Sequence, residues 1–269
     1  MKKYASNLLA ISLALVSIYF LWHFVRQPVC HPDTIIDAQT TKSGLTKLGD
    51  TIVIGTNAEY PPFSFLRDGK IVGFDIDVAQ EVVKRLGKKA ELLDMPFDML
   101  LPYLQLGNVH IIAAGISPKP SRAKHVLFSK PYLENDPLLV ITSANTPKIT
   151  SVDDLAGKVV VVNDGYTADS YISERKDVTV QRLSTPAEAF LALSSGRAYA
   201  YVAATSSVQR FFATHAQKYN TFTLVDTSDA YTLVISPVHP ELLPLVQEAL
   251  DAMTADGTLD ALKKTWGLA

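Results

Sequence analysis

The sequence is poor in cysteine, which limits both how the fold can be held together and what chemistry it can perform. Cys30 is the one cysteine among 269 residues, so no disulfide can form within the chain and no Cys-x-x-Cys motif exists. The six histidines show no metal-ligand spacing, and neither a glycine-rich phosphate loop nor a Gly-x-Ser-x-Gly elbow is present. We therefore expect no metal and no other cofactor.

The sequence also lacks an excess of charge of either sign. The formal net charge is −2 and basic residues form only short pairs, which argues against a nucleic-acid partner. Apolar residues make up 48% of the chain and charged residues 19%, as in globular proteins with a hydrophobic core. A length of 269 residues allows one large domain or two smaller ones.

The first 30 residues have the pattern of an export or anchoring segment. Two lysines precede an apolar run at residues 8–25, which is long for a signal core and barely long enough to span a membrane. Cys30 follows it and resembles the lipidated cysteine of bacterial lipoproteins, although Val29 replaces the usual Gly or Ala. A lipoprotein, an uncleaved anchor and simple secretion all agree with this pattern. Each places the rest of the chain in the periplasm or another extracytoplasmic space, after a flexible tether at residues 31–49.

Short apolar strands alternate with helices along the rest of the chain. β-branched runs at residues 51–56 and 109–114 predict buried strands, and the apolar spacing over residues 76–86 predicts a helix. Thr185-Pro-Ala-Glu188 is a capping box with proline at the first helical position. This alternation predicts a wound α/β fold, with binding residues at the carboxyl ends of the strands.

Three polar residues are expected to cap helices. Asp75 stands at the start of the helix at residues 76–86, and we interpret it as a structural cap. Ser121 is expected to cap a short helical turn that carries Arg122. Thr167, after Gly165, is expected to cap the next helix and to leave its first main-chain amides available.

The stretch Ala113-Ala-Gly-Ile-Ser-Pro-Lys-Pro-Ser-Arg122 combines the features of an anion site. A predicted strand ends in Gly115, and two prolines then stiffen the chain ahead of Arg122. Glycine lets a ligand approach the backbone closely, and the planar guanidinium of arginine matches a carboxylate. The alternative is a surface loop whose arginine pairs with a neighbouring acid.

This stretch, continued through Ala-Lys-His-Val-Leu-Phe-Ser-Lys-Pro-Tyr132, resembles the signature of the polar amino-acid-binding proteins of ABC importers. That family includes arginine-, histidine- and glutamine-binding proteins, and the similarity extends over roughly residues 50–268. The resemblance implies a periplasmic-binding-protein-like α/β fold of type II, with two α/β lobes joined by a two-strand hinge. Lobe 1 would comprise residues 50–136 and 229–269, and lobe 2 residues 137–228.

The resemblance also implies a set of ligand contacts in the cleft between the lobes. Two aromatic residues, Tyr60 and Phe97, would face each other and sandwich the ligand side chain. Arg122 would clamp the ligand carboxylate, opposite a turn that presents the amide of Thr167. The complete set of predicted ligand residues comprises Asn57, Glu59, Tyr60, Phe97, Gly115, Ser117, Arg122, Asn163 and Thr167. Glu59 is not part of the family motif and is included because it is acidic and lies on the same loop as Asn57 and Tyr60.

One position departs from the family pattern. Relatives carry an aspartate at the end of the strand predicted at residues 199–203, where it pairs with the α-ammonium group of the ligand. This chain has Ala204 there, and no acid lies within two residues of it. The carbonyl of Gly115, or Ser117, Asp164 or Glu59, could replace the aspartate; otherwise the ligand is not an ordinary α-amino acid.

We expect a monomeric binding protein, not an enzyme, that delivers arginine or another basic amino acid to an inner-membrane ABC permease. Stacking of Tyr60 and Phe97 on a guanidinium, with Glu59 and Asn57 at one end, favours a basic ligand. Glutamine or another neutral polar amino acid fits equally well if Glu59 is merely solvated. The remaining alternative is a cyclohexadienyl or arogenate dehydratase of the same fold, with Glu59 or Asp164 as the acid.

Overall fold

The computed structural model describes residues 49–268. The apolar run at residues 8–25, Cys30 and all but the last residue of the predicted tether lie outside the described residues, so their roles stay predictions. Within residues 49–268, no helix is long and apolar enough to cross a membrane. In the same range, no group of His, Cys, Asp and Glu side chains is arranged to hold a metal ion.

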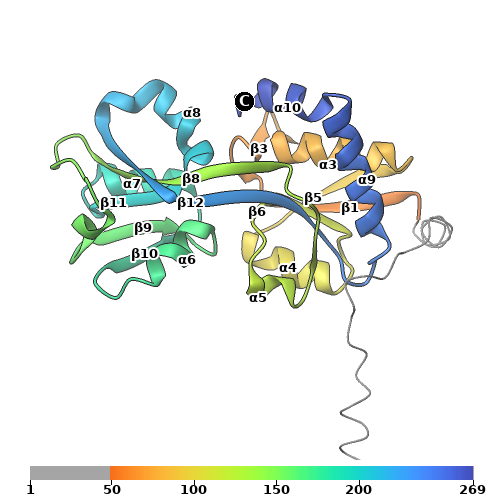
Figure 1. The fold of residues 1–269 in the computed structure, drawn as a ribbon, viewed down its shortest axis with the longest axis horizontal. Coiled ribbons are helices and arrows are strands. Elements are labelled where there is room, and N and C mark those ends of the chain that lie inside the picture. Colours follow the sequence, from red (N-terminus) through yellow and green to blue (C-terminus); the bar gives the residue numbers. More distant parts are fainter. Residues whose placement is uncertain (1–48, 269) are drawn as a thin grey trace, which may run out of the picture. The chain divides into compact units, whose positions relative to one another are not determined.

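The first lobe, on the right in Figure 1, has a parallel sheet at its centre. In it, β1 (Thr51–Thr56) pairs with β5 (Lys89–Asp94) on one side and with β6 (Ile111–Ile116) on the other. β-branched residues make up most of β1 and half of β6, which favours strands in these apolar runs. Its helices are α3 (Phe74–Arg85), α4 (Phe97–Gln105), α9 (Leu242–Ala255) and α10 (Thr258–Trp266).

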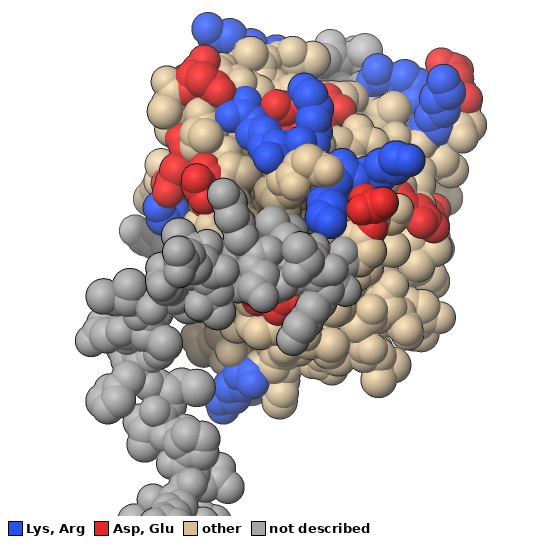
Figure 2. All heavy atoms as spheres, turned by 90° about the vertical axis from the view of Figure 1, so that its right-hand side faces the viewer, with Lys and Arg blue, Asp and Glu red and all other residues tan. Residues whose placement is uncertain are grey.

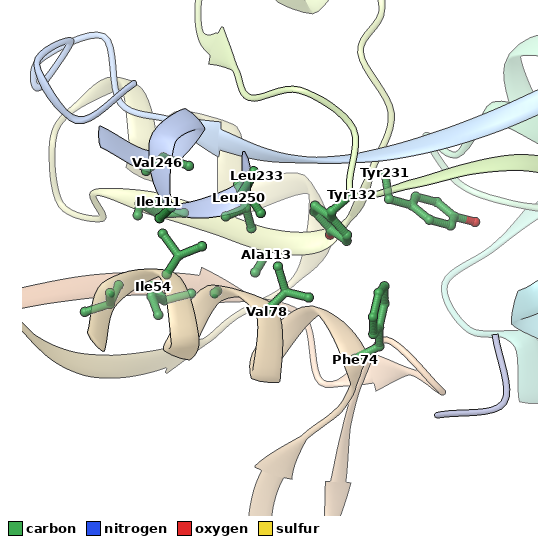
Figure 3. Packing of buried hydrophobic residues seen from close by; sticks show 14 of the residues in the cluster. Ile54, Phe74, Val78, Ile111, Ala113, Tyr132, Tyr231, Leu233, Val246 and Leu250 are labelled. Carbon is green, nitrogen blue, oxygen red and sulfur yellow. The ribbon is translucent and has the colours of Figure 1, made fainter. Parts of the chain in front are cut away.

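The hydrophobic core of the first lobe lies between this sheet and the helices α3 and α9 (Figure 3). Ile54 of β1 and Ile111 of β6 belong to one buried cluster with Val78 of α3 and Val246 of α9. Full burial of each such side chain contributes about 1.5–3 kcal/mol to the free energy of folding. Trp266, predicted to be a core anchor, packs against this cluster.

A small antiparallel sheet follows β1 in the chain. It consists of β2 (Glu59–Tyr60), β3 (Ser64–Arg67) and β4 (Lys70–Val72), and it leads directly into α3. Phe65 of β3 meets Trp266 of α10 edge to face, with ring centroids 5.8 Å apart. The Nε1 of Trp266 donates a hydrogen bond to Asp77 of α3 at 2.8 Å, so this sheet, α3 and the carboxyl end of the described chain support one another.

The second lobe, on the left in Figure 1, repeats the same construction. β9 (Val159–Asn163) pairs in parallel with β10 (Thr179–Leu183) and with β11 (Ala200–Ala204). The predicted capping box is confirmed, because the hydroxyl of Thr185 accepts the Glu188 N–H and the Glu188 carboxylate accepts the Thr185 N–H. The helices of this lobe are α6 (Thr167–Ser173), α7 (Pro186–Ser194) and α8 (Thr205–His215).

Two long antiparallel strands, β8 (Leu133–Ser143) and β12 (Tyr219–Ile235), cross between the lobes. β12 pairs with β6 of the first lobe, and β8 pairs with β11 of the second. Nine of the described strands thereby form one sheet in the order β10-β9-β11-β8-β12-β6-β1-β5, with β7 (Leu127–Phe128) on β12. The fold is therefore the expected type II arrangement, two α/β lobes with a two-strand hinge.

The register of the hinge is irregular where the strands leave the second lobe. Pairing of β12 with β8 is regular from Tyr219 to Leu224 and then shifts before Asp229, and it shifts again before Tyr231. Irregular pairing of this kind turns a side chain away from its expected face. It places Asp229 opposite Asp136 of β8, at the boundary between the lobes.

The structural cap assigned to Asp75 is wrong. Gly73 precedes α3 as its N-cap residue, and Asp75 lies inside the first turn. Its Oδ2 accepts a hydrogen bond from the main-chain N–H of Gly115 instead. Because Asp75 is fully buried, the pKa of its carboxyl group rises from 3.8 to about 6, although the N–H of Gly115 and the hydroxyl of Tyr132 lower it.

The caps predicted for Ser121 and Thr167 are also wrong, for a common reason. An N-cap residue has an extended backbone. In both helices the residue with this extended backbone comes earlier in the chain than the residue predicted to be the cap. α5 (Pro120–Ala123) starts after Lys119, and α6 starts at Thr167 after Tyr166. This shift releases the Thr167 hydroxyl for a contact in the cleft.

The surface of the first lobe has charges of both signs. On the face that Figure 2 shows, acidic and basic side chains are interspersed. Ion pairs of this lobe include Lys84 with Glu81 at 2.8 Å and Arg85 with Asp256 at 2.8 Å.

Candidate functional site: the cleft between the lobes

A cavity of about 800 Å³ lies between the lobes, at the carboxyl ends of their strands. From the first lobe it is lined by the segments after β1 and before α4 and by Arg122; from the second, by the turn after β9 and the start of α7. Four of the nine predicted ligand residues line it, namely Asn57, Glu59, Phe97 and Arg122. Three others line a smaller neighbouring cavity, namely Tyr60, Asn163 and Thr167.

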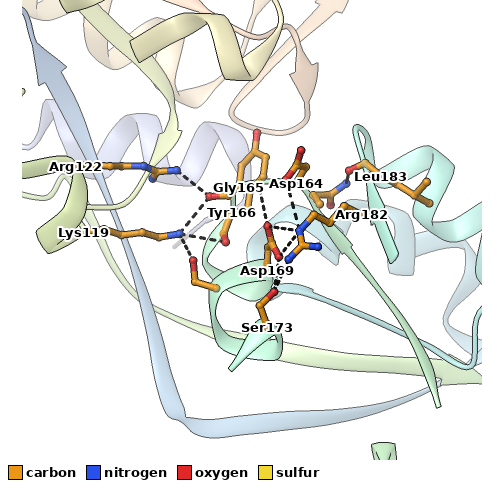
Figure 4. A network of polar contacts seen from close by, with 11 residues as sticks. Lys119, Arg122, Asp164, Gly165, Tyr166, Asp169, Ser173, Arg182 and Leu183 are labelled. Carbon is orange, nitrogen blue, oxygen red and sulfur yellow. Dashed lines mark hydrogen bonds and ion pairs between the residues drawn. The ribbon is translucent and has the colours of Figure 1, made fainter. Parts of the chain in front are cut away.

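Arg122 reaches across the cleft (Figure 4). Its Nη2 donates a hydrogen bond to the carbonyl of Gly165 in the second lobe at 2.8 Å, and its Nη1 donates to the carbonyl of Ser117 at 3.4 Å. A guanidinium has more N–H donors than these two bonds use, so it can also bind a carboxylate. The arginine therefore lies where an anion clamp is expected, and it pairs with main-chain carbonyls instead of the neighbouring acid of the alternative interpretation.

Lys119 is a second cationic link between the lobes that the sequence analysis missed (Figure 4). Its Nζ donates to the carbonyls of Gly165 and Tyr166, both at 3.2 Å, and to the Ser170 hydroxyl at 2.7 Å. Burial, together with the positive charge of the nearby Arg122, lowers the pKa of Lys119 to about 8. The position of Lys119 between two prolines was the available signal, because proline restricts where the chain can direct it.

Tyr166 fills the space between the two predicted sandwich residues. Its ring stacks on Phe97 with centroids 4.4 Å apart and an interplanar angle of 22°, and it lies 4.7 Å from Tyr60 at 30°. Tyr60 and Phe97 thus do flank a planar group, but that group is a side chain of the second lobe. That these two rings sandwich the ligand side chain stays a prediction, and Tyr166 went unrecognised because it follows a common strand–glycine turn.

Gly115 has a different role from the one expected. Its φ is +60°, and a Cβ there would lie 3.0 Å from Cε1 of Tyr60, so the group that approaches its backbone is the tyrosine ring. Its main-chain N–H donates to Asp75 and is not available to a ligand. Gly115 therefore offers no amide to a ligand, and its lack of a side chain lets the Tyr60 ring pack against it.

The two predicted asparagines are held within their own lobes. Asn57 donates through Nδ2 to the carbonyl of Met95 at 3.2 Å, and Asn163 donates to the carbonyl of Leu183 at 3.3 Å. Asn163 also accepts a hydrogen bond from the hydroxyl of Tyr201. Both side chains are buried and fixed in place, whereas Glu59 is exposed at the rim of the larger cavity.

Asp229 of the hinge strand β12 is the other residue that the sequence analysis missed. Its carboxylate accepts hydrogen bonds from the hydroxyl of Ser117 in the first lobe and from that of Thr167 in the second, the latter at 3.0 Å. Burial raises the pKa of Asp229, while these two hydroxyls act in the opposite direction. The available signal was that Asp229 is the one acid among residues 227–236.

These features, a cleft between two α/β lobes with an arginine that crosses it, agree with a comparison of whole sequences. Residues 52–269 match the family described as bacterial extracellular solute-binding proteins, family 3. The chain belongs to this family. It is 30% identical over 224 residues to the ABC transporter arginine-binding protein 1 of Escherichia coli (strain K12), covering 81% of this chain and 90% of that protein.

Other proteins similar to this chain are named for different ligands or activities. The chain is 30% identical over 223 residues to the L-cystine-binding protein TcyJ of the same organism, covering 80% of this chain and 82% of that protein. A similar solved structure is that of the ancestral amino acid-binding protein AncCDT-1, a precursor of cyclohexadienyl dehydratase. It has a TM-score of 0.74 and 32% sequence identity, and the match covers 84% of this chain and 99% of that chain.

Proposed function

We propose that this member of the solute-binding proteins captures an L-amino acid with a positively charged side chain, arginine above all, and delivers it to an ABC permease. The family assignment and the relatives named for arginine and cystine support an amino acid as the ligand and an ABC transporter as the partner. The positive charge of the ligand side chain is inferred from the cleft itself.

The distribution of charge in the larger cavity carries this inference. Of the described residues that line it, Arg122 is the one with a positive charge, and it binds a carboxylate in the proposal. The other charged residues of the lining are all acidic, and carboxylates around a cleft raise the local concentration of cations. The acidic residues are Glu59, Asp94, Asp98, Asp164 and Glu188.

Titration calorimetry of the purified full-length chain with each common L-amino acid tests the proposal. Arginine, and more weakly lysine and ornithine, should bind, whereas glutamate should not, because a second carboxylate would face the acidic lining. Selective binding of glutamine or another neutral amino acid would retain the family function and refute the basic ligand. Absence of binding by every amino acid would refute the proposal.

The dehydratase alternative is supported by one observation, the similarity to a dehydratase precursor. The candidate acids Glu59 and Asp164 are both exposed. We propose binding without catalysis, and incubation of the protein with prephenate or arogenate should yield neither phenylpyruvate nor phenylalanine. Either product, absent from a boiled control, would establish an enzyme.

We also propose that the protein works outside the cytoplasm as a monomer, held to the membrane through the N-terminal apolar segment or a lipid on Cys30. Fractionation of cells that express the wild type and Cys30→Ser distinguishes these possibilities. Release of the variant into the soluble extracytoplasmic fraction would support lipidation. Membrane retention of both proteins would support an uncleaved anchor, and a soluble wild type would support simple secretion.

A further inference from the structure

Asp229 lines a small polar cavity near the larger one. The walls also include Tyr60 of the first lobe, Asn163 and Thr167 of the second lobe, and Ala204 at the end of β11. The free space is about 10 Å³, roughly what one buried water needs, and an ammonium group is similar in size to a water molecule. Because Ala204 has only a methyl group, no other carboxylate enters this space from β11.

The hydrogen bonds of Asp229 leave one carboxylate oxygen available on the described part of the chain. The hydroxyls of Ser117 and Thr167 and the N–H of Ala230 all donate to Oδ1. Oδ2 accepts none of the hydrogen bonds found among the described residues. A carboxylate that is 4% exposed and receives donors on one oxygen only has the capacity for a further strong donor.

Ser117 connects this carboxylate to the arginine. Its hydroxyl donates to Asp229, and its carbonyl accepts from Nη1 of Arg122 at 3.4 Å. A negative and a positive group therefore lie on either side of one residue. The two ends of an α-amino acid, a carboxylate and an ammonium on the same carbon, have the complementary charges.

We propose that Asp229 binds the α-ammonium group of the ligand while Arg122 binds its carboxylate, so that the cleft selects free α-amino acids over acids that lack the amine. This assignment rests on the proposed function and extends it. It answers the question left by Ala204, because the acid comes from the hinge strand β12 instead of β11. It also couples binding to closure, since both lobes donate hydroxyls to the same carboxylate.

The burial of Asp229 agrees with this role. Removal from water raises the pKa of its carboxyl group, and the neighbouring Asp136 raises it further. A cation at Oδ2 would offset both effects by stabilising the ionised form. Asp136 differs, because its oxygens accept from Ser206 and from the hydroxyl of Tyr231.

The test compares ligands with and without the amine. Calorimetry on the full-length wild type, Asp229→Asn and Asp136→Asn would use L-arginine and 5-guanidinopentanoate, and as a second pair L-glutamine and 4-carbamoylbutanoate. Asparagine at 229 still accepts from Ser117 and Thr167 but loses the charge. Asp136→Asn is the control, because it makes the same aspartate-to-asparagine change at the residue of β8 that pairs with Asp229.

The wild type should prefer the amino acid of a pair by about 10- to 100-fold, the range of one charge-assisted hydrogen bond. Asp229→Asn should reduce this preference to about threefold or less, and Asp136→Asn should retain it. An equal loss of affinity for both members of a pair in Asp229→Asn would overturn the proposal in favour of a structural role.

A wild type that binds both members of a pair equally well would overturn the proposal even if Asp229→Asn does not fold. If Asp229→Asn binds an amino acid and still prefers it over the analogue without the amine as strongly as the wild type does, the role of Asp229 is refuted. The proposed function would remain intact. If the wild type binds no amino acid of either pair and no other L-amino acid, both the proposed function and the role of Asp229 fail.

Discussion

Removal of the Tyr166 ring should make the protein bind its ligand more tightly. The ring lies between Phe97 and Tyr60, with centroids at 4.4 Å and 4.7 Å, where the proposed ligand side chain is expected to stack. A ligand that reaches from Arg122 and Asp229 into the acidic cavity has to displace this ring. In Tyr166→Ala no such displacement is needed.

The two ring contacts set the size of the effect. Each aromatic pair contributes about 0.5–1.5 kcal/mol beyond its buried area, so the displaced contacts amount to about 1–3 kcal/mol. Since 1.4 kcal/mol corresponds to a tenfold change in affinity, Tyr166→Ala should bind arginine roughly 5- to 150-fold more tightly. The links from Lys119 and Arg122 end on main-chain carbonyls and on the Ser170 hydroxyl, so the substitution leaves them in place.

Titration calorimetry with arginine on Tyr166→Ala and Tyr166→Phe checks this expectation. Phenylalanine keeps the ring and should leave the affinity within about threefold of the wild-type value. Circular dichroism would confirm that both variants are folded. Unchanged or weaker binding by Tyr166→Ala would refute the argument, and it would mean that Tyr166 is part of the liganded site and not a competitor for it.

Three further predictions concern Arg122, the acidic residues that line the cavity, and Asp75. Arg122→Ala should lower the affinity for an amino acid by about 100-fold or more in calorimetry, because at least two charge-assisted hydrogen bonds are lost; an unchanged affinity would contradict the anion clamp. Glu59→Gln and Asp98→Asn should each weaken arginine binding by about two- to fivefold at low salt and by less at 0.5 M salt, because salt screens the interactions of exposed charges. Neither substitution should change the affinity for glutamine, and equal effects on both ligands would count against the basic ligand. The folded-state pKa of Asp75, about 6, exceeds its ordinary value of 3.8, so the folded protein holds an extra proton between these values and stability falls as pH rises through that window. Asp75→Asn has no such titration, so its free energy of unfolding relative to the wild type should rise between pH 4 and pH 7. The rise should be up to about 3 kcal/mol, at 1.36 kcal/mol per pKa unit. Urea denaturation measures this difference, and a difference that does not change with pH would rule out a buried, protonated Asp75.

Local sequence signals were enough for most individual elements of the fold. The β-branched run at residues 51–56 forms β1 with the predicted bounds, and Thr185 and Glu188 form the predicted capping box. These features depend on contacts between residues close in the chain, so the pattern of side chains reveals them. The position of Arg122 at the cleft followed from its strand–glycine–proline context in the same way. The exact lobe boundaries stay a prediction.

The tertiary structure alone decided which side chains meet in the cleft. Asp229 contacts Ser117, 112 positions away, because β12 crosses between the lobes with an irregular register. Tyr166 stacks on Phe97 because a turn of one lobe closes onto a helix start of the other. Asp75 binds the amide of Gly115 and does not cap its own helix. Periodicity and motifs report on neighbours along the chain, whereas these contacts depend on strand order, register and lobe closure, which the whole chain determines together.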